Sequence, residues 1–353
     1  MCYYIEMRPI LLKFSKTKID KAGESLKTSS ATRIESDEAL EILSGWRAFH
    51  TAPLNIFATA LRVRIKKTCK STGWIVAQRL KRTPSIVLKL KTHKTMRLST
   101  MQDIGGVRAV LNTVQEIYDL VHVYRTSRSS HKLFALHDYI ATPKQDGYRS
   151  VHLIYRLNKD PQIFIEIQVR SYLQHIWATA VEVFGTLKNS SFKSGYGDKR
   201  WLELFSYLST IFSMKEGTPV LKDHSSLSRE QVLGRLKRMI KDLKAIEQLT
   251  VYTAIYKITA QKTKSKGKSG GYSIIFLDSN NNTISVQSFG VEKIEEATST
   301  YIDLEKKFYN DANINVVLVN AGDIKKLEVS YPNYFMDTRS LIQYLSQIML
   351  DEF

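Results

Sequence analysis

The clearest periodic pattern in the chain is the recurrence of β-branched residues at every second position over residues 163–170 (IFIEIQVR). A period of two predicts a β-strand, because successive side chains of a strand point to opposite faces. The face predicted to be core carries Ile163, Ile165, Ile167 and Val169. The opposite face carries Phe164, Glu166, Gln168 and Arg170. This second face suits the floor of an active site, and it suits equally an exposed sheet face with a cross-strand ion pair.

Further strands and helices flank this segment in an order typical of an α/β core. Strands are predicted over residues 105–112, 149–157 and 162–171, and helices over 113–127, 172–187 and 200–214. Helices at 16–26, 36–50 and 53–69 precede this part. The pattern therefore predicts a mixed sheet with flanking helices that ends near residue 215.

Cap and charge signals mark the ends of the N-terminal helices. Ser36 is predicted to be an N-cap, followed by acids that suit the positive end of the helix dipole. Pro53 restarts the chain into a helix with a basic end. The cations of that end are Arg62, Arg64, Lys66, Lys67 and Lys70. The pair Thr83–Pro84 breaks the chain again, and Ser85 is predicted to cap a helix that carries Lys89 one turn later.

The region after residue 215 has a different organisation. A charged helical segment at 228–249 leads to a strand at 251–260, a basic loop at 261–271, a strand at 272–278 and a turn at 279–282. A helix near 291–310, a strand at 314–321, a short helix and a final helix at 338–350 follow. These elements predict a small α+β C-terminal domain. The expected boundaries are a first domain at 1–215, a helical linker at 216–250 and a second domain at 251–353.

Composition narrows the possible partners. The chain has 353 residues, enough for two domains with a core each, and a net charge of +18 with a pI near 9.6. Such a balance favours a polyanionic partner such as a nucleic acid or a nucleotide. No apolar run approaches the roughly 20 residues of a spanning helix and no signal-peptide pattern is present, so a cytoplasmic protein without a membrane partner is expected. Only Cys2 and Cys69 occur, too few for a disulfide framework or a cysteine zinc site.

Two separated acidic residues with many cations near them suggest phosphoryl chemistry. Asp103 precedes a strand that opens with two glycines, Arg108 follows five residues later, and Glu166 lies on the polar face described above. Such carboxylates can hold Mg²⁺, which takes its remaining ligands from phosphates and water. Phosphate-type donors occur at Arg79, Lys81, Ser85 and Lys89. Each signal is weak alone, since the acid can be a turn cap and the cations a solvated face, but together they favour metal-assisted phosphoryl transfer.

The segment 138–152 (DYIATPKQDGYRSVH) holds a further set of candidate residues. Its Asp-Gly pair is turn chemistry, because glycine accepts a positive φ. A plain hairpin has no need of a lysine before such a turn, a tyrosine directly after it and a histidine four residues later. Lys144, Tyr148 and His152 are therefore candidates for binding a substrate.

Four segments occur in an order and at a spacing that resemble the RelA/SpoT-type synthetase domain. They are RLKRTPSIVLKL (79–90), DIGGVRAV (103–110), the segment 138–152 and IEIQVRS (165–171). The resemblance covers roughly residues 40–215 and implies a nucleotidyltransferase-like α/β fold. Enzymes of this family move a pyrophosphate group from ATP to a ribose 3′-hydroxyl and release AMP. ATP as a substrate and Mg²⁺ as a cofactor are thereby implied.

The resemblance implies a role for each matching residue on the ATP side. The residues that would bind ATP are Arg79 and Arg108 at the adenine and Lys81, Ser85 and Lys89 at the phosphates. Asp103 would bind Mg²⁺. Glu166 would share the metal or act as the base on the attacking hydroxyl.

On the acceptor side the resemblance implies a stacking platform. Tyr148 would stack on the acceptor base, an arrangement that tolerates different bases. Lys144 and His152 would steer the acceptor phosphate or ribose, and Gln168 and Arg170 would support the site. Bifunctional relatives also carry a hydrolase built on histidine and His-Asp metal ligands. Here the only His-Asp pair is 137–138, and residues 1–75 offer just one histidine, His50, so hydrolysis is not expected.

Two acceptors fit the resemblance. Most of the family would modify GTP or GDP and make an alarmone. The segments 14–26 and 39–62 resemble in particular the toxic small alarmone synthetases, many of which modify the 3′-CCA end of tRNA and block translation. The charge fits a tRNA acceptor stem, and the basic stretches 62–70 and 262–268 are candidates for holding it, or are solvated lysines. A catalytically inactive RNA-binding module is the alternative from a different class, although both acids are intact.

The C-terminal region resembles the antitoxin part of the fused toxin–antitoxin proteins called CapRel. There a Tyr-x-x-Tyr segment closes the active site, and Tyr331 and Tyr334 have that spacing. The two rings could fill the adenine slot between Arg79 and Arg108, or they could pack under the final helix. The related domain descends from a zinc finger, but no cysteine follows Cys69, so zinc is not expected.

In this resemblance a phage structural protein, typically the major capsid protein, releases the inhibition and so provides antiviral defence. The apolar face of the final helix is predicted to be exposed and to receive this trigger. It carries Leu341, Ile342 and Leu345. The oligomeric state stays open, since small alarmone synthetases are often tetramers while fused forms need not be.

Overall fold

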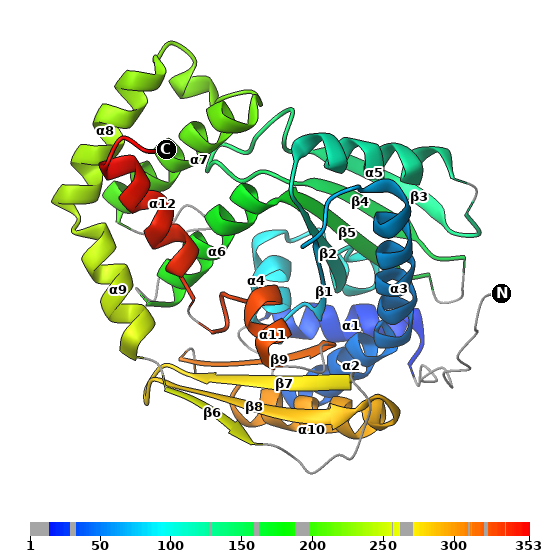
Figure 1. Ribbon diagram of the computed structural model, residues 1–353. Coiled ribbons are helices and arrows are strands. Elements are labelled where there is room, and N and C mark those ends of the chain that lie inside the picture. Colours follow the sequence, from blue (N-terminus) through cyan, green and yellow to red (C-terminus); the bar gives the residue numbers. More distant parts are fainter. Residues whose placement is uncertain are drawn as a thin grey trace.

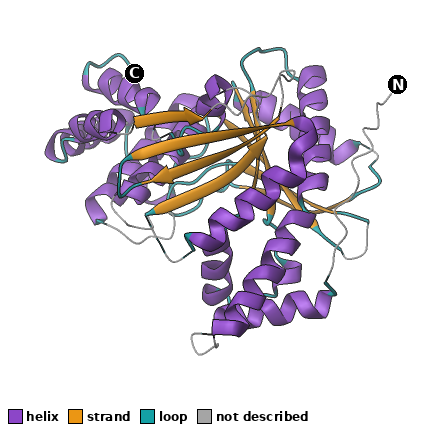
Figure 2. Ribbon diagram, turned by 90° about the horizontal axis from the view of Figure 1, so that it is seen from below, coloured by secondary structure: helices purple, strands orange, loops and turns teal. Residues whose placement is uncertain are grey.

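The computed structural model describes residues 14–28, 33–127, 129–158, 162–187, 198–255, 257–261, 271–309, 311, 313–320, 324–335 and 337–353. Within these ranges nine strands form one twisted sheet, with helices packed on both of its faces (Figure 1 and Figure 2). The strands lie in the order β3-β4-β5-β2-β1-β9-β7-β8-β6. The predicted mixed α/β fold with flanking helices is confirmed.

Helices and strands follow one another along the whole of the described chain. The strands are β1 (Ile75–Leu80), β2 (Gly105–Leu111), β3 (Lys132–Asp138), β4 (Val151–Arg156), β5 (Phe164–Ser171), β6 (Lys257–Gln261), β7 (Gly271–Asp278), β8 (Thr283–Gly290) and β9 (Ile314–Asn320). The α-helices are α1 (Lys16–Lys27), α2 (Arg33–Phe49), α3 (Thr51–Thr68), α4 (Thr83–Thr92), α5 (Val114–Thr126), α6 (Tyr172–Leu187), α7 (Lys199–Glu216), α8 (Arg229–Asp242), α9 (Ala245–Ile255), α10 (Ile294–Lys307), α11 (Ile324–Ser330) and α12 (Arg339–Met349). In the part of the chain described, none of these helices combines the length and the apolar character needed to cross a membrane.

The strand predicted from its period of two, β5, lies inside the sheet. It pairs in parallel with β2 and antiparallel with β4. Its β-branched face is core, as predicted: Ile165, Ile167 and Val169 are fully buried. The opposite face is not the exposed sheet face that was the alternative, because Glu166 and Arg170 are also buried. The helix α6, which contacts both β5 and β2, contributes to this cover.

The starts of three predicted helices differ from the structure. The helix α2 begins at Arg33, so Ser36 lies in its first turn and is not the N-cap. The helix α3 begins at Thr51, two residues before Pro53. The helix α4 has Arg82 as its N-cap, so Ser85 is not a cap either. The first turn of a helix tolerates proline, because its N–H groups have no partner within the helix, and so a proline marks the start only to within a turn.

Several further elements were not read correctly from the sequence, and neither β1 (75–80) nor β8 (283–290) was predicted as a strand. The patterns missed β3, an edge strand whose residues are mostly half-buried or exposed and which therefore lacks a clear buried alternation. Residues 251–255 were predicted as a strand but belong to α9, and β6 begins only at Lys257. A short apolar run does not by itself distinguish a strand from a buried helix. The contacts that α9 makes with α8 and α12 decide the question here.

The final helix is packed into the molecule rather than exposed. Figure 1 shows α12 lying against the helices α6, α8 and α9, which it contacts. Leu341 is 2% exposed and Leu345 is fully buried in the core that these helices share. The prediction that this apolar face is exposed is therefore wrong. The helix buries this face within its own chain.

The C-terminal strands extend the same sheet. The strand β9 pairs antiparallel with β1, where Val319 is opposite Arg79. On its other side β9 pairs with β7, and α11 contacts β1. The C-terminal region thus meets the N-terminal part at the strand that carries Arg79.

Candidate active site

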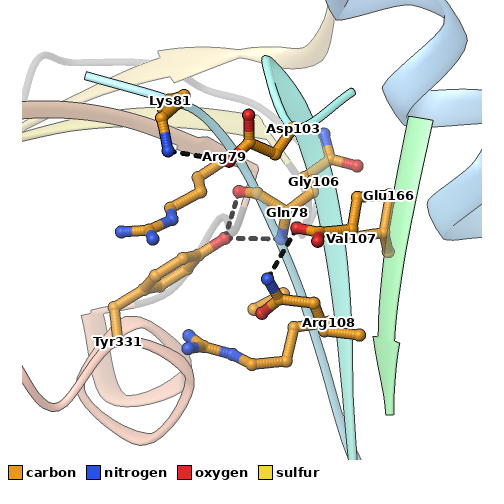
Figure 3. A pocket seen from close by; sticks show the side chains of 11 residues that line it. Gln78, Arg79, Lys81, Asp103, Gly106, Val107, Arg108, Glu166 and Tyr331 are labelled. Carbon is orange, nitrogen blue, oxygen red and sulfur yellow. Dashed lines mark hydrogen bonds and ion pairs between the residues drawn. The ribbon is translucent and has the colours of Figure 1, made fainter. Parts of the chain in front are cut away.

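A small pocket lies where β1, β2 and β5 run side by side (Figure 3). Its polar lining residues are Gln78, Arg79, Lys81, Asp103, Arg108, Glu166, Gln168 and, from the C-terminal segment, Tyr331. The cavity has a volume of about 90 Å³. Pockets that hold small-molecule ligands are larger, roughly 300–1,000 Å³. In this conformation Tyr331 takes up part of the pocket, and little space is left for a nucleotide.

The register of three strands brings predicted site residues into one row. Gly106 on β2 is opposite Arg79 on β1 and opposite Glu166 on β5. Two residues further along these strands, Arg108 on β2 is opposite Gln168 on β5. A side chain added at Gly106 would have its first carbon 4.0 Å from the Glu166 carboxylate. The glycine therefore forms an open floor between Arg79 and Glu166.

Asp103, at the mouth of β2, is held by two lysines. Its Oδ2 accepts a hydrogen bond from Lys81 Nζ at 2.8 Å and another from Lys89 Nζ at 2.9 Å. Burial acts to raise the pKa of Asp103, but the two ammonium groups outweigh it and hold this pKa below its ordinary value. Asp103 is therefore ionised at neutral pH. The lysines that the sequence assigned to ATP phosphates contact this carboxylate in the closed pocket.

The two acids fit a Mg²⁺ ion. Asp103 and Glu166 line the same pocket, and Asp103 Oδ1 is buried with no hydrogen-bond partner among the described residues. Mg²⁺ is bound in nucleotide sites by one or two carboxylates together with phosphates and water. No cluster of three or more metal-type side chains occurs within the described ranges. Asp103 and Glu166 are the residues that would hold the ion.

The ion pairs of Asp103 predict a pH dependence of stability. A carboxyl group whose folded pKa is depressed stabilises the fold above its unfolded pKa, and this contribution is lost as the pH falls through the folded pKa. We expect Asp103→Asn to reduce the free energy of unfolding at pH 7, with the difference from wild type narrowing once the pH drops below 3.8, its ordinary pKa. Urea unfolding at several pH values measures this. A difference that stays constant down to pH 2 would contradict it.

Glu166 is the centre of a chain of hydrogen bonds that reaches the acceptor candidates. His152 Nδ1 lies 2.8 Å from Glu166 Oε1, and Gln168 Nε2 donates to Oε2 at 2.7 Å. The other nitrogen of His152 is 2.8 Å from the Tyr148 hydroxyl. Burial acts to raise the pKa of Glu166, but the contacts with His152 and Gln168 outweigh it and leave this pKa lowered. Glu166 is thus an ionised carboxylate beside the loop of the segment 138–152.

Lys144 and Tyr148 lie together on that loop. The Lys144 ammonium group is 5.2 Å from the centre of the Tyr148 ring and 4.6 Å from that of Tyr139. Burial raises the pKa of Tyr148 to about 12, so its hydroxyl stays neutral. The structure therefore brings Lys144, Tyr148 and His152 together next to Glu166.

Arg170 and a histidine that sequence reasoning missed lie deeper in the structure. Arg170 is 3% exposed and follows Gln168 on the same face of β5. His175 on α6 is also buried, and neither of its ring nitrogens has a hydrogen-bond partner among the described residues. Burial, helped by Arg170 and Arg108, holds the pKa of His175 well below its usual value, so the ring is neutral. A lone histidine in an apolar helix offers no signal from which this position could have been found.

From the segment after α11, Tyr331 lines the pocket and Tyr334 contacts Arg79, one of its lining residues. The Tyr331 hydroxyl accepts a hydrogen bond from the Gln78 N–H at 2.8 Å and donates one to the Gln78 carbonyl at 2.6 Å. The Tyr334 hydroxyl accepts a hydrogen bond from Arg79 Nη1 at 3.1 Å. These contacts tie the C-terminal segment to β1.

The same segment also contacts the second arginine of the predicted adenine slot. Arg108 Nη2 donates to the carbonyl of Ser330 at 3.2 Å. In the view of Figure 3, Tyr331 points into the pocket toward Gln78, with the side chains of Arg79 and Arg108 on either side. Both tyrosine rings are nearly fully buried in a cluster that also includes Ala77 of β1. The two side chains therefore do both: they pack within the core, and they contact residues of the candidate site.

A buried ion pair joins the C-terminal region to the ATP side of the pocket. Arg47 on α2 pairs with Glu305 and bonds to Tyr301, both on α10. Its Nε donates to the Lys81 carbonyl at 2.8 Å, and its Nη1 donates to Thr83 Oγ1 at 2.9 Å. Sequence reasoning missed this group, because neither Arg47 nor Glu305, 258 residues later, lies in a local pattern that predicts their pairing.

Some predicted residues are not brought to the pocket. Ser85 and Lys89 are not among the residues that line it, although Lys89 reaches it through Asp103. In the basic stretch 62–70, Arg62 lies close enough to Tyr331 to interact with it electrostatically, while Lys66 and Lys67 are exposed. The second basic stretch, 262–268, lies outside the described residues.

Comparisons with known proteins find similarity over the segment that carries much of this pocket. Residues 78–189 match the model of the region found in RelA / SpoT proteins. The GTP pyrophosphokinase YwaC of Bacillus subtilis is 35% identical over 112 residues, 29% of this chain and 52% of that protein. The GTP pyrophosphokinase YjbM of the same organism is 32% identical over 111 residues, 30% of this chain and 52% of its own length. The chain thus spans about half the length of the curated relatives it matches.

Solved structures of small alarmone synthetases also match part of the chain. Small alarmone synthetase 2 from Bacillus subtilis is 24% identical, with a TM-score of 0.41, covering 48% of this chain and 90% of that one. Small alarmone synthetase 1 from the same organism, bound to its product pppGpp, is also 24% identical at a TM-score of 0.41, covering 49% and 93%. By sequence, residues 78–189, which include the whole row from Arg79 to Glu166, carry the region found in RelA / SpoT proteins.

Proposed function

We propose that the protein is an ATP-dependent pyrophosphotransferase that acts on a ribose 3′-hydroxyl. The observation that carries this proposal is the row Arg79, Gly106 and Glu166 with Asp103 beside it, inside the segment that matches the RelA / SpoT region. A carboxylate facing a phosphate-binding set of cations suits transfer of a phosphoryl group to a hydroxyl.

In the proposed reaction the acceptor 3′-oxygen attacks the β-phosphorus of ATP. The bond from this phosphorus to the α–β bridging oxygen breaks, and AMP leaves with the electron pair. Glu166, ionised because of its lowered pKa, takes the hydroxyl proton. Lys81 and Lys89 contact the Asp103 carboxylate in this structure. In the proposed reaction they would leave it and bind phosphate oxygens of ATP. When bound, Mg²⁺ would neutralise charge on the polyphosphate.

The proposed acceptor is the 3′-CCA end of tRNA, whose modification would block translation. The net charge of +18 supports it, because an RNA stem needs a basic surface while a nucleotide needs only a few cations. The second candidate is GTP or GDP, giving an alarmone. It is favoured by the relatives, which are named GTP pyrophosphokinases.

The C-terminal region is proposed to inhibit the enzyme. Support comes from Tyr331 and Tyr334, whose hydroxyls bond to β1 at the predicted adenine slot, and from the small cavity, about 90 Å³, that remains beside Tyr331. Activity would require this segment to leave the pocket.

A phage structural protein, with the major capsid protein as the first candidate, is the proposed trigger for opening. Moving a closed population from 99% to 1% takes about 5.5 kcal/mol of differential binding. A trigger must therefore make extensive contacts that exist only in the open form. Since Leu341 and Leu345 are buried, those contacts lie elsewhere or require α12 to move.

The acceptor is identified by a competition for label. Protein carrying Tyr334→Phe is incubated with γ-³²P-ATP, Mg²⁺, deacylated tRNA and GTP together. Because the transferred group includes the γ-phosphate, label is expected on tRNA and not on GTP. Label on GTP alone would establish the alarmone synthetase, and RNA binding without any transfer would leave an inactive RNA-binding module.

Removal of a single hydroxyl tests the inhibition. Tyr334→Phe keeps the buried ring but loses the hydrogen bond to Arg79, a charged donor whose contact is worth about 2 kcal/mol. We expect the open fraction, and with it the transfer rate without any trigger, to rise roughly 30-fold. Tyr309→Phe, on the same region but remote from the pocket, is the matched control. Equal rates for wild type and Tyr334→Phe in a folded protein would argue against occlusion.

A further inference from the structure

The active-site face of the sheet continues outward from the acceptor candidates to the edge strand β3. In the register of the sheet, Gln168 on β5 is opposite His152 on β4, and His152 is opposite His137 on β3. Directly opposed residues of antiparallel strands lie on the same face. His137 therefore lies on the face that carries Glu166, two strands further out.

Aromatic rings continue along this face of the sheet from Tyr148 toward β3. The Tyr139 ring lies 6.1 Å from the Tyr148 ring. The exposed ring of His137 is stacked with Tyr139, at 5.9 Å between centres and 14° between planes. The three rings make a continuous set that begins at the proposed acceptor platform and ends in solvent.

Phe134 extends this set to the far part of β3. The register of β3 against β4 shifts around this residue, so Phe134 lies at a bulge, a device that redirects a side chain. Its ring contacts that of Phe164 at 5.2 Å, and Phe164 alternates onto the same face as Glu166. The Phe134 side chain is nevertheless 46% exposed. An apolar ring on an exposed edge strand is a liability unless something binds it.

The charges beside these rings are positive. The Lys144 ammonium lies over Tyr139, the Arg156 guanidinium is 5.9 Å from the Phe134 ring centre, and Lys132 is opposite Arg156. The nearby acid Asp138 is engaged, since it accepts hydrogen bonds from the Tyr118 hydroxyl and from the N–H groups of its own turn. Flat rings interleaved with cations are the chemistry that binds unpaired nucleotides, by stacking on bases and by pairing with phosphates.

We propose that this surface, the β3 track (Phe134, His137, Tyr139, Lys144 and Arg156), binds the unpaired nucleotides that precede the acceptor nucleotide of a single-stranded RNA 3′ end. The inference rests on the proposed function, because it takes Tyr148 as the site of the acceptor base. The His137 and Tyr139 ring centres are 5.9 Å apart, and Phe134 lies three residues before His137, so the rings are spread along the sheet edge as binding of unstacked, splayed RNA bases requires. A mononucleotide acceptor would reach only Tyr148 and would not use the track.

Binding of a short RNA tests the track without requiring catalysis. The full chain is titrated against a fluorescein-labelled RNA tetranucleotide ending in CCA, and the Kd is read from anisotropy. Loss of one stacked base costs roughly 10-fold in affinity, so Phe134→Ala with His137→Ala is expected to weaken binding roughly 100-fold. Phe134→Tyr with His137→Phe keeps both rings and is expected to retain the affinity. Val291→Ala, which changes an exposed apolar residue elsewhere, is expected to leave it unchanged.

Other outcomes overturn the proposal in identifiable ways. An unchanged Kd for the alanine pair would show that the track does not bind RNA. Equal weakening by the ring-preserving pair would show that local structure, not stacking, was measured. A wild-type dimer in solution that the alanine pair dissociates would show that the edge binds a second copy. The proposed function fails separately, as absent transfer of label to tRNA while the tetranucleotide still binds.

Discussion

Replacing Glu166 by glutamine is expected to lower pyrophosphate transfer by about 10²–10⁴-fold, the range that a positioned base contributes. Glutamine keeps the size of the side chain but cannot accept the hydroxyl proton, and it lacks the negative charge that would help to hold Mg²⁺. The variant is made in the Tyr334→Phe background, where the pocket is expected to open. Initial rates with labelled ATP measure the loss.

The control variant distinguishes loss of the base itself from loss of a residue that only hydrogen-bonds to it. Gln168→Ala removes the donor to Glu166 Oε2 but leaves the carboxylate, so a much smaller loss is expected. The Kd for ATP in the absence of Mg²⁺, from equilibrium dialysis, should change little in either variant. A rate within tenfold of the parent for Glu166→Gln would remove Glu166 from the role of base.

Removing Glu305 is expected to destabilise the fold by about 3–5 kcal/mol, the cost of leaving a buried charge without its partner. Arg47 is fully buried and cannot regain water while α10 stays in place. It cannot shed its proton either, since arginine stays charged at any pH the protein survives. Equilibrium urea unfolding of Glu305→Ala, followed by circular dichroism, gives the change in free energy.

A paired replacement shows whether the loss comes from the orphaned charge. Arg47→Met with Glu305→Leu removes both charges at similar volume, and it is expected to be far more stable than Glu305→Ala alone. Arg47 also holds the Lys81 carbonyl and Thr83, so the paired variant is expected to bind ATP less well. A Glu305→Ala protein with wild-type stability would mean that α10 can detach and hydrate Arg47 without unfolding the rest.

Local pattern was sufficient for some elements that hold the candidate site, although β1, which carries Arg79, was not predicted as a strand. The β-branched residues of 163–170 determined a strand, and the position of Glu166 on its polar face followed from alternation alone. The segment around Asp103 and the turn before Tyr148 were equally readable, because turn chemistry and strand entry depend on neighbours in the sequence. Helix starts were less accurate, as Ser36 and Ser85 show, since a cap depends on where the chain leaves the helix.

Pairings between distant segments were decided only by the tertiary structure. Arg47 and Glu305 are 258 residues apart, and Tyr331 and Gln78 are 253 apart. Nothing in either local sequence specifies the other, because a buried ion pair or a hydroxyl contact needs only complementary groups at the right place. The burial of Leu341 and Leu345 followed likewise from which helices α12 met. The sequence thus determined which residues are candidates for the proposed chemistry. Long-range packing determined that Tyr331 stands among them, because joining β9 to β1 brings the C-terminal segment to that pocket.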